Sequence, residues 1–150
     1  MSKINYIVGD LFTTDCKVIA HQVNTYGVMG AGVALIVKDR FPKAFEEYYQ
    51  NSLLSNGLML GDAIIVDCGD KIIANIVGQN NTGRDGALYT SYDALHVGLT
   101  KLNKYCVTQG ITEVAMPMIG AGLGGGDWTQ IEQIIEEALV DVQPIVYKLQ

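Results

Sequence analysis

The 150-residue sequence predicts an α/β fold with a ligand site at one edge of its sheet. Short apolar runs typical of buried strands alternate with segments whose apolar residues recur at helical spacing. Two of the runs end in glycine-rich segments, AHQVNTYGVMGAGVA over residues 20–34 and GAGLGGGDW over residues 120–128, and each segment leads into a predicted helix. Because open α/β sheets bind ligands where strands end and helices begin, these two loops are the first candidates for a site.

Hydrophobic periodicity and turn residues predict the individual elements. Apolar runs bounded by turn residues predict strands over residues 3–8, 17–23, 63–68, 71–78, 113–119 and 144–149. Apolar residues at helical spacing predict helices over residues 32–40, 42–53, 128–141 and from residue 89 or 90 to residue 108. Pro42 suits the first position of its helix, and Gly57 and Gly110 end two of the helices. The runs on either side of Gly69-Asp70 are expected to form an antiparallel hairpin.

Three further segments carry expectations about exposure. The helix predicted over residues 32–40 has one apolar stripe, formed by Val33, Ile36, Val37 and Arg40. The segment GQNNTGRDGALYTSY over residues 78–92 is rich in Gly and Asn, which predicts a loop long enough to act as a lid. His96 has no polar partner motif beside it, so we expect it at the surface rather than in a catalytic site.

Composition and charge restrict the function classes. The length, with 49% hydrophobic and 17% charged residues, predicts a single domain over residues 1–150. A net charge of −6 and the absence of a Lys/Arg run disfavour nucleic-acid and membrane-surface binding. Cys16, Cys68 and Cys106 are far apart and lack metal-ligand spacing, so neither a disulfide framework nor a metal site is indicated. The N-terminus has no signal-peptide pattern, which predicts a cytoplasmic location.

Polar residues and glycines combine in the first loop. His21, Gln22 and Asn24 are expected where the second strand meets solvent. Glycines at 27, 30 and 32 would let a ligand approach the main chain, and the helix from Gly32 would direct its amide donors to the same place. The expected ligand is an anion, with a simple tight turn as the alternative. His21 and Asn24 can face the same ligand only if the chain bends at Val23.

Two acidic residues have both structural and functional interpretations. Asp10 follows the first strand and either caps a turn or accepts a hydrogen bond from an exocyclic amine. Asp127 either caps the last helix or orients a water molecule. The late loop also matches G-x-G-x-x-G at Gly120, Gly122 and Gly125. With 24 residues after Gly126, no room remains for the rest of a dinucleotide-binding sheet, so a Rossmann site is disfavoured.

Four motifs together resemble a macro domain: VGDLF, HQVNTYGVMGAGVA, MPMIGAGLGGGDW and the terminal VYKL. The pattern is most similar to the branch that contains yeast-type ADP-ribose 1″-phosphate phosphatases and terminal ADP-ribose glutamate hydrolases. The resemblance covers nearly the whole chain. It implies a three-layer α/β/α sandwich with a central mixed sheet, and a site for ADP-ribose that needs no cofactor and no metal.

The resemblance also implies individual roles. Asp10 is expected to accept the adenine amine, Asn24 to bind the distal ribose hydroxyls and Tyr147 to flank the adenine. The early loop is expected to wrap the distal ribose and one phosphate, and the late loop to hold the diphosphate from the other side. The expected ligand contacts are Gly9, Asp10, Leu11, Phe12, Gln22, Asn24, Gly27, Met29, Gly30, Ala31, Gly32, Val33, Ile119, Gly120, Ala121, Gly122, Leu123, Gly124, Gly125, Gly126 and Tyr147.

For the reaction, His21 matches a histidine of the phosphatase branch that is thought to be catalytic, and Asp127, the acid of the late loop, is the second candidate, as a residue that orients a water. Gln79 and Gly124 stand where the glutamate hydrolases have a lysine and an aspartate, which disfavours a lysyl covalent intermediate. The sequence therefore predicts ADP-ribose binding and hydrolysis of ADP-ribose 1″-phosphate. The alternatives are removal of ADP-ribose or acyl groups from ADP-ribosylated protein or O-acetyl-ADP-ribose, and a non-catalytic ADP-ribose reader.

Overall fold

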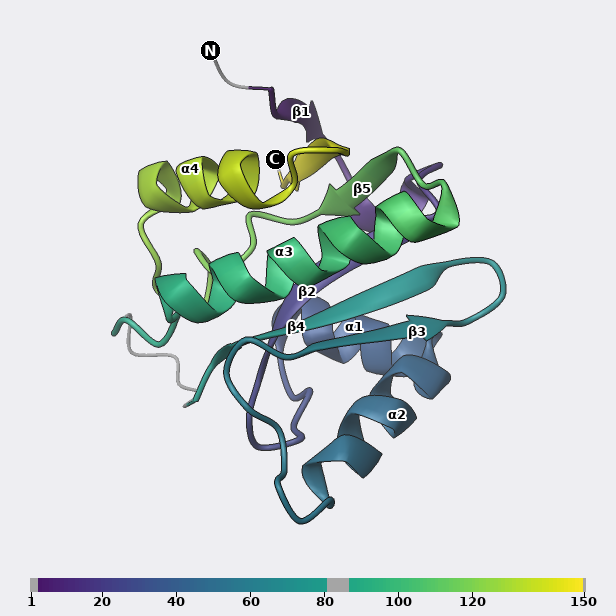
Figure 1. The fold of residues 1–150 in the computed structure, drawn as a ribbon, viewed down its shortest axis with the longest axis vertical. Coiled ribbons are helices and arrows are strands. Elements are labelled where there is room, and N and C mark those ends of the chain that lie inside the picture. The colour runs from purple at the N-terminus through teal and green to yellow at the C-terminus, as the bar shows by residue number, and fades with distance from the viewer. Residues whose placement is uncertain (1–2, 81–86, 150) are drawn as a thin grey trace.

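The computed structural model describes residues 3–80 and 87–149 and has a six-stranded mixed sheet at its centre (Figure 1). The strands are β1 (Asn5–Val8), β2 (Val18–Asn24), β3 (Ala63–Asp67), β4 (Ile72–Gln79), β5 (Glu113–Met116) and β6 (Gln143–Lys148). Their order in the sheet is β1-β6-β5-β2-β4-β3. The β3–β4 pair is antiparallel, as the hairpin prediction required, and the other pairs are parallel.

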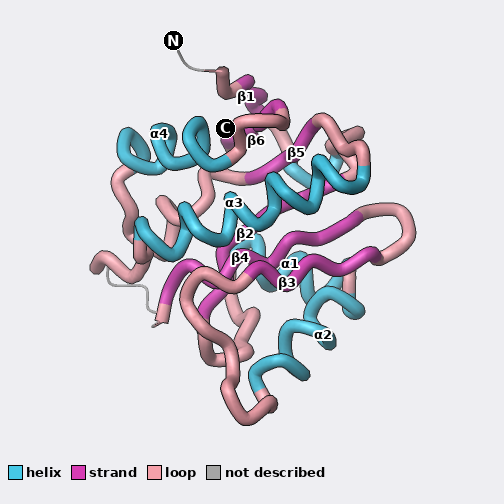
Figure 2. The backbone as a smooth tube through the Cα atoms, viewed as in Figure 1, coloured by secondary structure: helices cyan, strands magenta, loops and turns pink. Residues whose placement is uncertain are grey.

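Helices cover both faces of this sheet (Figures 1 and 2). The helices are α1 (Gly32–Arg40), α2 (Pro42–Ser52), α3 (Tyr92–Gln109) and α4 (Trp128–Ala138). Val37 of α1 and Tyr48 of α2 belong to one buried apolar cluster, whereas Leu99 of α3 and Ile135 of α4 belong to a second. The predicted three-layer α/β/α sandwich is therefore confirmed.

Strand β2 lies at the centre of the sheet and supplies both clusters. Ile19 and Val23 pack with the α1/α2 cluster, and Val18 and Ala20 pack with the α3/α4 cluster. Successive side chains of a strand point to opposite faces, so a strand covered on both faces becomes apolar almost throughout. This explains why the apolar run before His21 is continuous rather than alternating.

Several elements end at other residues than the sequence pattern predicts. β5 ends at Met116 instead of residue 119, because Pro117 has no N–H to donate and its carbonyl accepts from the Ile119 amide at 2.7 Å. α3 begins only at Tyr92, since the Ser91 side chain caps it by accepting from the Ala94 amide. The last helix, α4, ends at Ala138 instead of residue 141.

The predicted apolar stripe of α1 is wrong in part. Val37 is fully buried, but Ile36 is 41% exposed and lines the pocket described below. The cause is tertiary: one side of α1 packs on the sheet and the other borders a cavity. His96 lies at a half-exposed position, 3.9 Å from Glu137, as expected. Residues 81–86 of the predicted lid fall outside the described residues.

Candidate functional site

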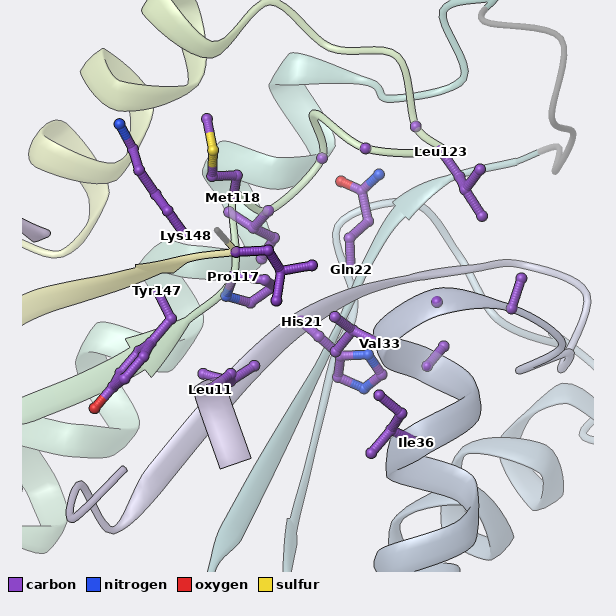
Figure 3. Close-up of a pocket in the computed structure, with 18 of the residues that line it drawn as sticks. Leu11, His21, Gln22, Val33, Ile36, Pro117, Met118, Leu123, Tyr147 and Lys148 are labelled. Carbon is purple, nitrogen blue, oxygen red and sulfur yellow. The ribbon is translucent and has the colours of Figure 1, made fainter. Parts of the chain in front are cut away.

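A cavity of about 710 Å³ opens where strands β1, β2, β4, β5 and β6 end (Figure 3). Its size falls within the range of small-molecule sites, and its position is the one that open α/β sheets use. Fifteen predicted contact or catalytic residues line it: Gly9, Asp10, Leu11, Phe12, His21, Gln22, Ala31, Gly32, Val33, Ile119, Gly120, Gly122, Leu123, Gly124 and Tyr147. The structure thus brings the two glycine loops to one cavity.

The N-terminus of α1 supplies free amide donors to this cavity. The N-cap residue, Ala31, has no side chain that could cap the helix, and the first intrahelical bond recorded is from Leu35 N to Ala31 O. The amides of Gly32, Val33 and Ala34 therefore have no acceptor among the described residues, and all three residues line the cavity. Such a helix end attracts anions, because its amides and the helix dipole act together.

The late loop supplies a second set of donors. Gly125 N and Gly126 N donate within the loop, to Gly122 O at 3.1 Å and Gly120 O at 2.8 Å. By contrast, the amides of Gly122, Leu123 and Gly124 have no acceptor among residues 3–80 and 87–149, and these three residues line the cavity. Consecutive free amides form a concave anion site. Two sets of three donors therefore come from opposite sides of one cavity.

The late loop is held by the segment before α3. Thr90 Oγ1 donates to Gly120 O at 2.8 Å, and the amides of Tyr89 and Thr90 both donate to Gly124 O. Gln22 Nε2 in turn donates to Thr90 Oγ1 and to Gln79 Oε1, each at 2.8 Å. A Cβ atom on Gly125, whose φ is +70°, would collide with Ala87 O. The loop is thus fixed by main-chain contacts that only glycine permits.

The early loop is held differently, by two buried side chains. Asn24 Oδ1 accepts from the amides of Tyr26 and Val28, and Asn24 Nδ2 donates to Val28 O at 3.0 Å. Tyr48 Oη lies 2.7 Å from Asn24 O and 2.8 Å from Asn24 Oδ1. Burial raises the pKa of Tyr48 to about 12, so the phenol stays protonated and donates. Asn24, predicted to bind ribose, here holds the loop and lies outside the pocket lining.

Strand β2 is irregular at Val23, where a bend was the condition for His21 and Asn24 to face one ligand. The pairing of β2 with β4 shifts register between Val23 and Asn24, as at a bulge or a similar irregularity. His21 faces the α1/α2 side by regular alternation with Ile19 and Val23, and Asn24 beyond the shift contacts Tyr48 of α2 on the same side. The bend does not bring Asn24 into the pocket, however, because Asn24 is used by its own loop.

His21 differs from its prediction. The sequence places it where the strand meets solvent, but β2 continues to Asn24 and the His21 side chain is only 1% exposed. Its Nε2 lies 2.6 Å from Asn75 Oδ1, and its Nδ1 has no partner among the described residues. Burial lowers the pKa of His21 to about 4, against the opposing effect of the Asn75 bond. The imidazole that lines the pocket is therefore neutral at pH 7.

Both acidic residues act as caps. Asp10 Oδ1 accepts from Phe12 N at 2.9 Å at the start of the 3₁₀ turn η1 (Leu11–Thr13), and Asp10 also lines the pocket. Asp127 Oδ2 accepts from Gln130 N at 3.3 Å, so Asp127 is the N-cap of α4. The cap interpretation of Asp127 is confirmed, and the residue is not part of the pocket lining. Asp10 alone is placed both to cap a turn and to meet a ligand.

The remaining predicted residues and the pocket lining differ in two ways. Predicted residues outside the lining are Asn24, Gly27, Met29, Gly30, Ala121, Gly125, Gly126 and Asp127. Lining residues that were not among the predicted contacts are Ala34, Ile36, Gln79, Pro117, Met118, Lys148 and Leu149. Most of the second set are apolar, and only their position just after a strand or one turn into α1 could have signalled them. Gln79, named above only as the residue at the lysine position of the glutamate hydrolases, ends β4 and is also a polar strand end.

The described part of the chain holds neither a metal cluster nor a membrane-spanning helix. Among residues 3–80 and 87–149, no group of three or more His, Cys, Asp or Glu side chains is arranged to hold a metal ion. No helix in the same residues is both long and apolar enough to cross a membrane.

Comparison with known proteins agrees with this geometry. The chain is 31% identical over 147 residues to a DNA ADP-ribosyl glycohydrolase of Mycobacterium bovis, covering 96% of this chain but 42% of that protein. It is 29% identical to the human ADP-ribose glycohydrolase OARD1, covering 99% and 93% of the two chains. An ADP-ribose 1″-phosphate phosphatase of Meyerozyma guilliermondii is also 29% identical, with 97% and 100% covered.

Solved structures and a family profile extend the agreement. The macrodomain of Mycobacterium tuberculosis DarG has a TM-score of 0.82 and 30% identity, with 96% of each chain covered. The profile of the macro domain matches residues 20–135, which contain α1, the first glycine loop and the late glycine loop. The chain therefore belongs to the macro domain family.

Proposed function

We propose that this protein binds ADP-ribose in the pocket and hydrolyses an ADP-ribose derivative at its distal ribose, with ADP-ribose 1″-phosphate as the first candidate substrate. One observation carries the proposal: six free amides, three from α1 and three from the late loop, converge on one cavity. Asp10 and Lys148 are the charged residues of the lining, so main-chain donors rather than cationic side chains would hold the diphosphate.

Asp10 supports the orientation of the ligand. Its Oδ1 is used by the Phe12 amide, and its second carboxylate oxygen has no partner among the described residues. A free carboxylate oxygen at the pocket suits the exocyclic amine of adenine. The adenosine would then lie near residues 9–12 and 147, and the diphosphate between the two amide sets. The distal ribose would lie toward His21, Gln22 and Gln79.

The hydrolysis of a 1″-phosphate consumes one water and yields ADP-ribose and inorganic phosphate. At pH 7 the His21 ring is neutral, so it can accept a hydrogen bond at Nδ1 but cannot act there as an acid. Gln79 Oε1 accepts from Gln22, and neither amide side chain is a nucleophile. These features favour direct attack by water over a covalent enzyme intermediate.

The similarity to two glycohydrolases favours a second candidate, the removal of ADP-ribose from a macromolecule. The mycobacterial relative is named for ADP-ribosylated DNA. That name makes DNA a substrate class to test, although the acidic composition led us to expect no nucleic-acid partner. ADP-ribosylated protein and O-acetyl-ADP-ribose belong in the same test. A non-catalytic reader would bind ADP-ribose and turn over none of these compounds.

Calorimetry and parallel turnover assays test the proposal. We expect ADP-ribose to bind without added metal, and phosphate to be released from ADP-ribose 1″-phosphate. No binding at millimolar ADP-ribose would contradict the binding site. Binding without phosphate release, but with release of ADP-ribose from modified protein or DNA, would select the second candidate. Binding with no turnover of any substrate would identify a reader.

A further inference from the structure

Asn75 lies beneath the pocket and its side-chain amide has one possible orientation. The residue is fully buried in β4, directly opposite His21 in the pairing with β2. Asn75 Nδ2 donates to Ile64 O at 3.1 Å and Ala44 O at 3.4 Å. A flipped amide would place Oδ1 against these two carbonyl oxygens, which cannot donate. Asn75 Oδ1 therefore faces the His21 ring.

This orientation decides which nitrogen of His21 carries the proton. Asn75 Oδ1 accepts only, and it lies 2.6 Å from Nε2, so Nε2 must be the protonated nitrogen. In a neutral imidazole the other nitrogen, Nδ1, then has a free lone pair. Nδ1 is buried and has no partner among the described residues. Figure 3 draws the ring near Val33 and Ile36, which line the same pocket.

A buried acceptor without a donor costs free energy unless something in the pocket supplies the hydrogen. We propose that Asn75 is a positioning residue that fixes His21 with the proton on Nε2, so that Nδ1 accepts a hydrogen bond from a hydroxyl group of the bound ligand. The inference rests on the proposed ADP-ribose site for the identity of the ligand. It excludes a phosphate oxygen at this position, because a lone pair repels an anionic acceptor. A sugar hydroxyl is the matching chemical class.

The free wild-type protein tests the first part of the proposal. ¹⁵N NMR of the His21 ring at pH 7 should give a protonated-type resonance for Nε2 and an unprotonated-type resonance for Nδ1. A proton on Nδ1, or an averaged pair of resonances, would overturn the role of Asn75. This measurement needs no variant and no ligand.

Addition of ADP-ribose tests the second part. At saturation measured by calorimetry, the Nδ1 resonance should move upfield, as expected for a nitrogen that accepts a hydrogen bond, while Nε2 stays protonated. An unchanged Nδ1 resonance at saturation would overturn the hydroxyl contact. If ADP-ribose does not bind, the proposed function and this contact both fail, whereas the spectrum of the free protein still decides the role of Asn75.

A pair of variants separates positioning from stability. Asn75→Leu removes the acceptor, so the ring should lose its single protonation pattern and ADP-ribose affinity should fall by roughly tenfold, the loss of about one hydrogen bond. Asn103→Leu is the matched control, because Asn103 of α3 is a buried Asn that pairs with Asp141 in the turn between α4 and β6. It should lower the melting temperature and leave the His21 resonances unchanged. A wild-type His21 pattern and affinity in Asn75→Leu would overturn the proposal.

Discussion

The two glycine loops of this macro domain present the same chemistry but are held in different ways. The early loop depends on buried side chains, with Asn24 and Tyr48 fixing residues 24–28 before α1 begins. The late loop depends on main-chain contacts, with Gly120 and Gly124 carbonyls bound by the segment before α3. Two similar groups of free amides are thus held in place by side-chain hydrogen bonds in one loop and by close backbone contacts in the other. Substitutions should therefore affect the two loops differently.

The largest expected effect comes from blocking the free amides of Gly122, Leu123 and Gly124 in the late loop. Gly122 has no positive φ, and a Cβ there would meet no atom within 4 Å, so Gly122→Glu should fold. Its carboxylate would enter the proposed diphosphate site, and we expect ADP-ribose affinity to fall roughly a thousandfold, or about 4 kcal/mol. Gln133→Glu adds the same charge on the exposed face of α4 and should bind normally in calorimetry. Equal affinities in both variants would show that the loop is only a turn.

The next largest effect is the pH dependence of stability that is caused by His21, the buried histidine before the early loop. Because the pKa of His21 is about 4 when folded and about 6.5 when unfolded, the unfolded chain takes up the proton first as pH falls. Keeping the buried His21 neutral therefore costs no stability above about pH 6.5, where the unfolded chain is neutral too. As pH falls from 6.5 to 4, proton uptake by the unfolded chain lowers the free energy of unfolding by about 3 kcal/mol in total.

Urea titrations at pH 7 and pH 4.5 measure this dependence. The wild-type free energy of unfolding should fall more between the two pH values than that of His21→Gln, which cannot take up the proton. His96→Gln, at a half-exposed position, serves as the control and should behave like the wild type. Identical pH dependence in wild type and His21→Gln would contradict the buried, neutral state of the ring.

A third prediction contrasts one glycine from each loop. Gly125→Ala combines a positive φ with a collision against Ala87 O, so the free energy of unfolding should fall by about 1–3 kcal/mol. Gly30→Ala has no positive φ and its Cβ would lie 3.6 Å from Val28 Cγ1, an ordinary contact. Its stability should match the wild type in chemical denaturation. If the two variants lose equal stability, close backbone packing does not distinguish the loops.

The smallest effect should come from the phenol of the early loop. Tyr48→Phe removes the donor to Asn24, and the net loss of one buried hydrogen bond is about 1 kcal/mol. Tyr49→Phe is the control, since Tyr49 is 40% exposed on the same helix. Thermal unfolding should show a lower melting temperature for Tyr48→Phe only. A normal melting temperature in Tyr48→Phe would mean that Asn24 holds the loop without it.

The sequence by itself determined most of the helices and strands, the hairpin and the two loops, and its resemblance to macro domains implied the layers. Periodicity reports burial directly, so α1 and α2 begin where the apolar spacing and Pro42 place them. The glycine clusters after two strands identified the donor sets, because glycine is needed wherever another backbone or a ligand comes close. The fold and most of the pocket could be predicted for these local reasons.

Tertiary structure decided the roles of individual polar side chains. His21 and Asn24 look alike in the sequence, as polar residues at a strand end, yet one lines the pocket and the other holds a loop. Asn75, opposite His21, could not be recognised, because a polar residue within an apolar run has no local signature of its partner. Hydrogen-bond partners lie 54 positions away for His21 and 24 for Asn24. Only the assembled sheet and helices bring such groups together. Which group donates and which accepts, as between His21 and Asn75, is decided by those tertiary contacts.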